Sequence, residues 1–222
     1  MNSKIKNISK ACSVNDEIFS LIVKNLRDKT LKTELDIDKF IRKETRKRKL
    51  KNSFPPVVAI GKNAAEIHHK ANNSKLKKGF LVIDFGVKYK EYCSDCTRTL
   101  YLGKPNKAEI KLYNLVLEAQ LTALNHVQPG VYAADIDLIA RAVLQDYWKN
   151  FIHGTGHGVG LKIHQAPNLK PRGKLFLKNN QAITIEPGLY FKRKLGIRIE
   201  DTIIVKNNPE ILTKITKKLI TI

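Results

Sequence analysis

The chain has 222 residues, of which 42% are hydrophobic and 27% are charged, enough for one large domain or two small lobes with a sizeable core. No apolar run approaches the ~18 residues of a membrane span, and the first residues lack the apolar core of a signal peptide. The three cysteines are too few, and odd in number, for a disulfide framework, which predicts a reducing cytoplasm. The formal net charge of +21 either attracts nucleic acid, an anionic membrane surface or acidic partners, or reflects a lysine-rich solvated surface.

Two amphipathic helices are predicted first. Apolar residues recur at helical spacing over residues 5–26. A second helix begins at a capping box, in which Thr33 and Asp36 satisfy each other's free backbone N–H groups. It ends in residues 42–51, the densest basic run of the chain, and Pro55 prevents any continuation of the helix. This run is the candidate contact surface for nucleic acid or the ribosome.

Strands are predicted next. Residues 57–60 form a buried strand, and residues 79–86 and 91–102 form two strands in hairpin order. The last range contains Cys93 and Cys96, whose spacing invites a zinc or redox interpretation. Because residues three apart in a strand point to opposite faces, the two thiols would not chelate together. We therefore expect structural cysteines.

After residue 105 the same order of elements is predicted to start again. Apolar spacing predicts two further helices, and a glycine-rich segment with three histidines leads into a second pair of strands. The predicted ranges are 112–124 and 136–147 for the helices, 151–164 for the histidine segment, and 183–186 and 197–205 for the strands. Each half thus contains a helix, a second helix, a polar turn and a strand pair.

Local matches between the halves support a duplication, with generic helix and strand patterning as the alternative. The matching segments are Asp36-Ile-Asp38 with Asp135-Ile-Asp137, Val82-Ile-Asp84-Phe-Gly86 with Thr184-Ile-Glu186-Pro-Gly188, and Ser94-Asp95 with Ile199-Glu200. We therefore expect an α+β fold in one catalytic domain, residues 1–222, with related halves at about 1–105 and 106–222.

Each predicted hairpin carries an acid on each strand, Asp84 and Asp95 in the first and Glu186 and Glu200 in the second. Burying a carboxylate is costly unless its charge is compensated. If the hairpins pack about a pseudo-two-fold axis, the four acids converge with a histidine, and two divalent cations cancel their charge. This oxygen-rich set with one imidazole suits Mn²⁺, Fe²⁺, Co²⁺ or Zn²⁺. Two ions ~3.5–4 Å apart can share a hydroxide and polarise an acyl carbonyl, which indicates a hydrolase, most simply of peptides.

Five ordered motifs span nearly the whole chain. They are Ser53-Phe54 with the segment that ends in His68, Asp84-Phe-Gly with Ser94-Asp95-Cys-Thr-Arg-Thr, His153-Gly-Thr-Gly-His157 with His164, Ile185-Glu186-Pro-Gly, and Gly196-Ile-Arg198-Ile-Glu200-Asp201. Together they resemble the creatinase/methionine aminopeptidase ("pita-bread") metallopeptidases, and most closely the Xaa-Pro aminopeptidase and prolidase branch. The resemblance implies a pita-bread fold of two pseudo-symmetric helix-helix-hairpin halves around a dinuclear metal site. It also implies an aminopeptidase that removes the N-terminal residue of peptides, foremost Xaa-Pro peptides.

The resemblance further implies which residues hold the metals. Two divalent ions are expected, manganese first, with cobalt, zinc or iron as alternatives. The implied ligands are Asp84 on one ion, His157 and Glu186 on the other, and Asp95 and Glu200 bridging both.

Four further residues receive roles by the same resemblance. His68 and His164 would bind the substrate and stabilise the tetrahedral intermediate, while His153 and Arg198 would support the site from close by. Glu186 would also hold or deprotonate the bridging water. The histidines that match no motif are expected at the surface or as satisfied core residues, and these are His69 and His126.

Two alternative functions stay open. Methionine aminopeptidases of the short bacterial type also consist of the catalytic domain alone, but they usually lack the counterparts of His157 and of the ending Arg198 to Asp201. The other alternative is a non-catalytic protein on the same fold that binds nucleic acid or the ribosome through its basic surface.

This chain departs from the Xaa-Pro branch in two ways. The branch commonly carries an extra N-terminal domain, for which we expect no room here, and Gln165 replaces an acid often found after the equivalent of His164. The choice between dipeptidase and aminopeptidase action and the oligomeric state stay open.

Overall fold

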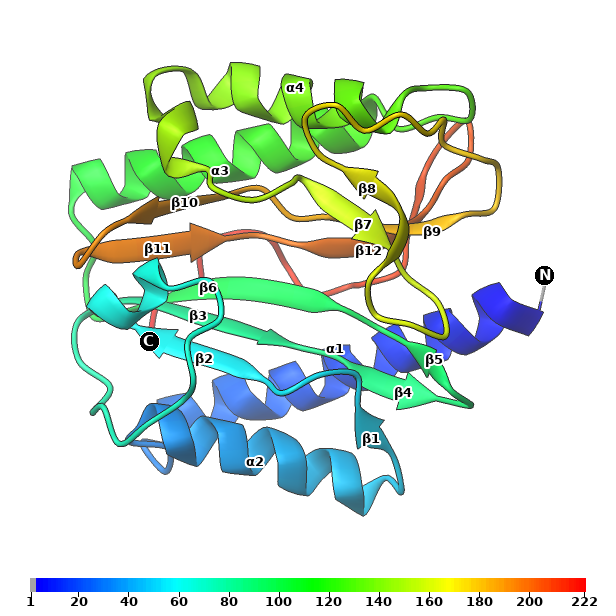
Figure 1. Ribbon diagram of the computed structural model, residues 1–222. Helices are drawn as coiled ribbons and strands as arrows, with labels where there is room; N and C mark the ends of the chain where they lie inside the picture. The colour runs from blue at the N-terminus through cyan, green and yellow to red at the C-terminus, as the bar shows by residue number, and fades with distance from the viewer. Residues whose placement is uncertain (1–2) are drawn as a thin grey trace.

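Four α-helices among residues 3–222, which the computed structural model describes, enclose the strands from two sides (Figure 1). The pair α1 (Ser3–Arg27) and α2 (Glu34–Lys47) lies below the strands, and the pair α3 (Lys107–Asn125) and α4 (Ala133–Leu144) lies above them. This mixture of layers confirms the predicted α+β class. Within the described range, no helix is both long and apolar enough to cross a membrane.

The two lower helices agree with the predicted elements. On α1 the buried face includes Ile8, Ile18 and Ile22, as the apolar spacing predicts. At the start of α2 the Thr33 hydroxyl accepts a hydrogen bond from the Asp36 backbone N–H at 3.1 Å. The Asp36 carboxylate in turn accepts one from the Thr33 backbone N–H at 2.9 Å. The capping box is therefore confirmed.

Replacing Thr33 with alanine is expected to lower the free energy of unfolding by about 1 kcal/mol, because the Asp36 amide loses its acceptor. Thr33→Asn keeps an acceptor and is expected to stay close to the original stability. Urea unfolding of both variants measures the difference. An alanine variant as stable as the original chain would contradict this role of the cap.

The first half is built on a three-stranded antiparallel sheet in the order β2 (Val57–Ile60), β3 (Gly79–Phe85) and β6 (Cys96–Leu102). A short 3-10 helix, η1 (Gly61–Ala65), follows β2. Beside this sheet lies a smaller one. Its strands are β1 (Lys51–Asn52), β4 (Val87–Tyr89) and β5 (Tyr92–Cys93). The predicted hairpin is confirmed by the pairing of β3 with β6.

The second half holds a five-stranded sheet and a two-stranded hairpin. The sheet runs β13 (Glu210–Ile211), β12 (Asp201–Ile204), β9 (Ala182–Ile185), β7 (Gly156–Gly158) and β8 (Gln165–Leu169), and the hairpin is β10 (Gly188–Phe191) with β11 (Leu195–Arg198). The predicted helix over residues 136–147 ends early, at Leu144. Gln145 adopts a positive φ of 44°, and the 3-10 helix η2 (Gln145–Asn150) follows.

Two predicted strands are not continuous. The range 91–102 is interrupted between β5 and β6, and the range 197–205 is interrupted between β11 and β12. Contacts between the halves explain both breaks. The Thr202 hydroxyl donates to the Asp95 carbonyl at 2.7 Å, and the Glu200 backbone N–H donates to the Thr97 carbonyl at 3.1 Å. At each break the backbone therefore bonds across to the other half, which fixes Asp95 and Glu200 at the junction.

The halves repeat the same order of elements. In each half a pair of helices is followed by four consecutive strands with a turn after the second, from β3 to β6 and again from β9 to β12. An ion pair recurs as well: Asp38 pairs with Arg42 at 2.8 Å on α2, and Asp137 pairs with Arg141 at 2.7 Å on α4. These recurrences support two pseudo-symmetric halves.

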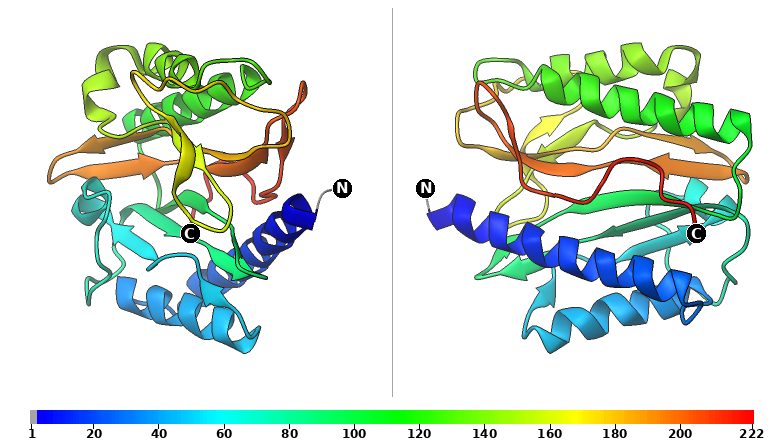
Figure 2. Two further views of the ribbon diagram at one scale, coloured as in Figure 1. Left: turned by 45° about the vertical axis from the view of Figure 1, so that its right-hand side comes forward. Right: turned by 180° about the vertical axis from the view of Figure 1, so that it is seen from behind.

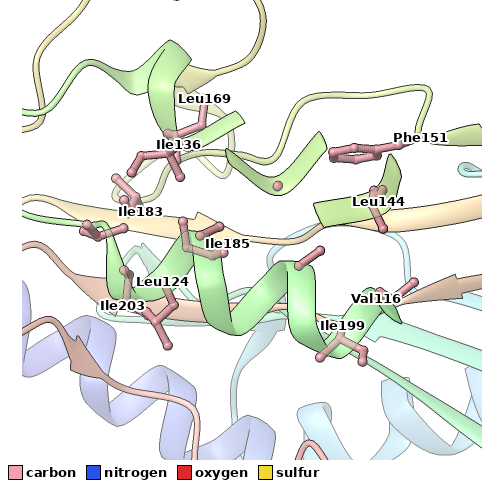
Figure 3. Packing of buried hydrophobic residues seen from close by; sticks show 14 of the residues in the cluster. Val116, Leu124, Ile136, Leu144, Phe151, Leu169, Ile183, Ile185, Ile199 and Ile203 are labelled. Atoms are coloured by element: carbon pink, nitrogen blue, oxygen red, sulfur yellow. The ribbon is translucent and has the colours of Figure 1, made fainter. Parts of the chain in front are cut away.

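Each helix pair covers its own hydrophobic core. Above the strands, residues of α3 and α4 such as Val116, Leu124 and Ile136 pack against Ile183 and Ile185 of β9 (Figure 3). Below them, α1 and α2 pack on β2 and β3. Figure 2 shows from behind that the C-terminal segment runs along the strands. The junction between the two halves is thus held from both sides by packed helices.

Candidate metal centre

A cavity of about 490 Å³ opens at the junction of the two halves. Eight of the nine residues named from the sequence line it: Asp84, Asp95, His157, Glu186, Glu200, His68, His164 and Arg198. The ninth, His153, lies behind this lining. Side chains from both hairpins and from the glycine-rich segment therefore meet in one place, as the sequence predicts.

The predicted ligands lie close together in the cavity. One ligand atom each of Asp95, His157 and Glu200 falls within 4.8 Å of the others. His157 Nε2 is 3.5 Å from Asp95 Oδ2 and 3.3 Å from Glu186 Oε1. Asp84 joins the group through Arg198, whose Nη2 is 2.8 Å from Asp84 Oδ2.

The glycine-rich sequence places His157 against the second hairpin. A Cβ at Gly156 would collide with the carbonyl oxygen of Thr184, so only glycine lets β7 approach β9 this closely. The Thr184 hydroxyl accepts a hydrogen bond from the His157 backbone N–H at 3.0 Å and donates to Glu186 Oε1 at 3.1 Å. One threonine thus positions both neighbouring ligands.

The protonation of His157 follows from its hydrogen bond. Nδ1 lies 3.1 Å from the carbonyl oxygen of Gly158, which can only accept, so Nδ1 carries the proton. Burial lowers the pKa of His157, which favours the neutral ring. The lone pair of Nε2 therefore faces carboxylate oxygens of Asp95 and Glu186. A bound cation would satisfy these facing acceptors, and in its absence a proton on one of the acids would do so.

The four carboxylates crowd one another. Burial raises the pKa of Asp95 well above its usual value, and the charges of Glu200, Asp84 and Glu186 raise it further. Burial, followed by the charges of Glu186 and Asp84, also raises the pKa of Glu200. For Glu186 burial raises the pKa to about 7, although the Arg198 guanidinium opposes this effect. Without a bound cation these acids are therefore driven to hold protons rather than negative charge.

The residues present fit divalent cations. Asp84 Oδ1 is buried and has no hydrogen-bond partner among the described residues. Four carboxylates and one imidazole form an oxygen-rich set that suits Mn²⁺, Fe²⁺, Co²⁺ or Zn²⁺ rather than a thiolate zinc site. The nearby Cys96 does not join the set, because its Sγ donates to the Glu200 carbonyl at 3.6 Å. All three cysteines are free, as expected of structural thiols.

A hydrogen-bond chain connects His153 to the carboxylates. His153 Nδ1 lies 2.8 Å from the Gly154 carbonyl, so Nε2 accepts from the Tyr190 hydroxyl at 2.8 Å. Burial and the Arg198 charge lower the pKa of His153 to about 3, which keeps the ring neutral. Tyr190 accepts from Arg198 Nη1 at 2.8 Å. His153 therefore positions Arg198 and does not line the cavity.

Arg198 and Thr97 extend this chain to Glu200. The Thr97 hydroxyl accepts from Arg198 Nε at 3.0 Å and donates to Glu200 Oε2 at 2.7 Å. Sequence reasoning assigned no role to Thr97 or Tyr190. Thr97 lies inside one of the five motifs, two residues after Asp95, so motif membership was an available signal, whereas Tyr190 lies two residues beyond the motif that ends at Gly188.

A second buried network holds Glu200 from below. Asp201 accepts from Arg98 Nη2 at 2.6 Å, from the Thr213 hydroxyl at 2.6 Å and from Lys217 Nζ at 2.7 Å. Burial would raise the pKa of Asp201, but the charges of Arg98 and Lys217 overcome it and lower that pKa. Arg98 also donates to the Glu200 carbonyl. Asp201 thus supports the ligand next to it.

The remaining histidines separate into two groups. His68 and His164 are exposed within the cavity, and the rings of His164 and His157 lie edge to face with centroids 4.5 Å apart. Burial lowers the pKa of His164. His69 is a satisfied core residue that pairs with Glu34 at 2.8 Å, although it also reaches the cavity wall. The exposed His126 bonds the Thr122 carbonyl of its own helix.

This fold and this constellation of acids and histidine define a metallopeptidase. The chain belongs to metallopeptidase family M24, which it matches over residues 6–207. The predicted resemblance and pita-bread fold are thereby confirmed.

Several similar proteins are named for action on Xaa-Pro bonds. The chain is 35% identical over 222 residues to the Xaa-Pro dipeptidase of Pyrococcus furiosus, covering 98% of this chain and 63% of that protein. The solved Xaa-Pro dipeptidase of Bacillus anthracis has a TM-score of 0.94 and 36% identity, covering 100% of this chain and 63% of that one. The X-Pro aminopeptidase of Thermotoga maritima has a TM-score of 0.94 and 32% identity, covering 100% and 64%. The chain spans less than two thirds of the length of each relative.

Proposed function

We propose that the chain is a metal-dependent aminopeptidase that hydrolyses the N-terminal bond of Xaa-Pro peptides. The lone pair of His157 Nε2, which faces the carboxylates of Asp95 and Glu186, carries the proposal because that geometry calls for a bound cation. The names of the relatives support the substrate class. We also propose a cytoplasmic location, which the three free thiols support.

The proposed metal centre uses the predicted ligand set. Asp84 would hold one ion, His157 and Glu186 the other, and Asp95 and Glu200 both. Manganese is the proposed native metal, with cobalt, zinc and iron as the other candidates for this donor set. When bound, such a pair of cations supplies an acidified water or hydroxide between them and polarises a carbonyl group.

The remaining side chains of the cavity provide the proton and hydrogen-bond chemistry. Glu186 would hold the attacking water and take up its proton. His68 and His164 line the same cavity and would donate hydrogen bonds to the developing oxyanion. Arg198 keeps Asp84 oriented, and His153 holds Arg198 through Tyr190.

A peptide-library digestion with several metals tests this function. We expect release of the first residue from Xaa-Pro peptides only after the protein is loaded with a divalent metal, and loss of release on chelation. Preferential cleavage of Met-Xaa peptides would contradict the specificity and favour a methionine aminopeptidase. Metal-loaded protein that cleaves neither class would contradict the enzyme itself and favour a binding role.

A further inference from the structure

A second hollow, of about 480 Å³, adjoins the cavity of the metal centre. The two share Arg42, Phe54 and Pro55 as lining residues. The second hollow is also lined by Arg46 and Lys51, and none of its lining residues is acidic. We call it the basic hollow. A peptide that leaves the cavity past Phe54 and Pro55 therefore enters a concave surface of positive charge.

Arg42 differs from its counterpart in the other half. The guanidinium of Arg141 is fully engaged, because it bonds Asp137 and the carbonyls of Phe151 and His153. Arg42 donates only its Nε, to both oxygens of Asp38 at 3.0 and 2.8 Å. Its side chain is 41% exposed, and its two Nη groups form no hydrogen bond with described residues. The five N–H donors of a guanidinium form a fork that suits a carboxylate. In Arg42 the four Nη–H donors of this fork are available to a ligand.

The rest of the basic run is partly neutralised away from the hollow. Lys47 and Arg48 both pair with Glu44 at 2.8 Å. In contrast, Arg46 and Lys51 are exposed and form no ion pair with described residues. Since Arg46 lies four residues after Arg42 on α2, both side chains face the same side of that helix. Arg46 and Lys51 therefore bring unpaired positive charge to the basic hollow, whereas the exposed Lys43 and Lys49 lie outside its lining.

We infer that the basic hollow is a substrate subsite that binds carboxylate groups of the residues following the scissile bond, and that acidic peptides are the preferred substrate class. The inference rests on the proposed function. The basic hollow adjoins the cavity, and the residues that follow the scissile bond must extend out of that cavity. This favours those residues as the occupant of the basic hollow. The charge complementarity selects acidic residues there.

The test compares C-terminally amidated Ala-Pro pentapeptides that carry one glutamate or one lysine at the third, fourth or fifth position. For metal-loaded protein we expect kcat/KM to favour glutamate over lysine by about tenfold at the best position, with the preference shrinking in high salt. Arg46→Glu with Lys51→Glu is expected to abolish or invert the preference while cleavage of an all-alanine tail is retained.

Lys39→Glu with Lys43→Glu is the matched control. Both lysines are exposed on α2 and together carry the same charge as Arg46 and Lys51, and neither lines the cavity or the basic hollow. The control pair is expected to keep the glutamate preference. Equal loss in both double variants would overturn the inference and assign the effect to the net charge of the whole surface.

Fluorescence anisotropy of the same peptides, labelled at their C-terminal ends, provides a readout that does not need cleavage. Protein that cleaves Ala-Pro peptides without any charge preference overturns this inference and leaves the proposed function standing. Protein that binds acidic peptides through Arg46 and Lys51 but cleaves none keeps the subsite and overturns the proposed function. Loss of single-stranded RNA binding in the Arg46/Lys51 variant, without a peptide preference, would overturn the inference in favour of nucleic acid.

Discussion

His157→Ala and Asp95→Ala are each expected to reduce Xaa-Pro cleavage by on the order of a thousandfold or more. In the proposed site each of these side chains would hold a cation that contributes several kcal/mol of transition-state stabilisation, and every 1.36 kcal/mol or so corresponds to a tenfold change in rate. The steady-state rate with saturating metal measures the loss. Metal content per chain, determined on the same samples, is expected to fall with it.

His126→Ala is the control for this prediction, because this exposed histidine bonds only its own helix and lies in no motif. It is expected to keep full activity. Thermal melting separates a chemical effect from unfolding, since the ligand variants are expected to stay folded without metal. Substantial cleavage by a folded His157→Ala variant would remove the imidazole from the proposed site.

Glu186→Gln is expected to stabilise the metal-free protein, and increasingly so as the pH rises from about 4.5 to about 7. Burial raises the pKa of the folded Glu186 from 4.5 to about 7, so in this range the folded chain keeps a proton that the unfolded chain has lost. The contribution of the Glu186 carboxyl group to the free energy of unfolding is therefore fully present below pH 4.5 and is lost as the pH rises through about 7. That pKa difference corresponds to about 3 kcal/mol.

Urea unfolding in the presence of a chelator, at a series of pH values, measures this effect as the difference between variant and original chain. Taking the difference removes the contribution of the buried histidines, which runs in the opposite direction. Glu118→Gln, an exposed site on α3, is expected to show a flat difference. Saturating metal is expected to reverse the order of stabilities, because the original chain gains binding energy that the variant lacks. A flat difference for Glu186→Gln would contradict the crowding of the acids.

Local chemistry explains which features the sequence could predict. The capping box of Thr33 and Asp36 depends on residues three apart, and the structure contains it. The convergence of the acids could also be predicted, because a buried acid such as Glu200 in an apolar strand demands compensation wherever it lies. The class of fold follows from such patterns, and the expectation of a metal site rests on them as well.

Features that depend on the partner half could not be predicted in this way. Strand periodicity runs unbroken through Asp95 and Glu200, yet the chain leaves its ladder there to bond Thr202 and Thr97 of the opposite half. Tyr190 was missed for the same reason, since its role depends on His153, distant in sequence. The early end of α4 at Leu144 depends on the positive φ of the residue that follows, which apolar spacing does not encode.

Anomalous diffraction from crystals grown with manganese tests the central claim most directly. Two peaks ~3.5–4 Å apart are expected at the junction of the hairpins. Both must be surrounded by the oxygen and nitrogen atoms of Asp84, Asp95, His157, Glu186 and Glu200. Peaks elsewhere on the chain, or none in this cavity at saturating metal, would show that these side chains do not hold a pair of cations.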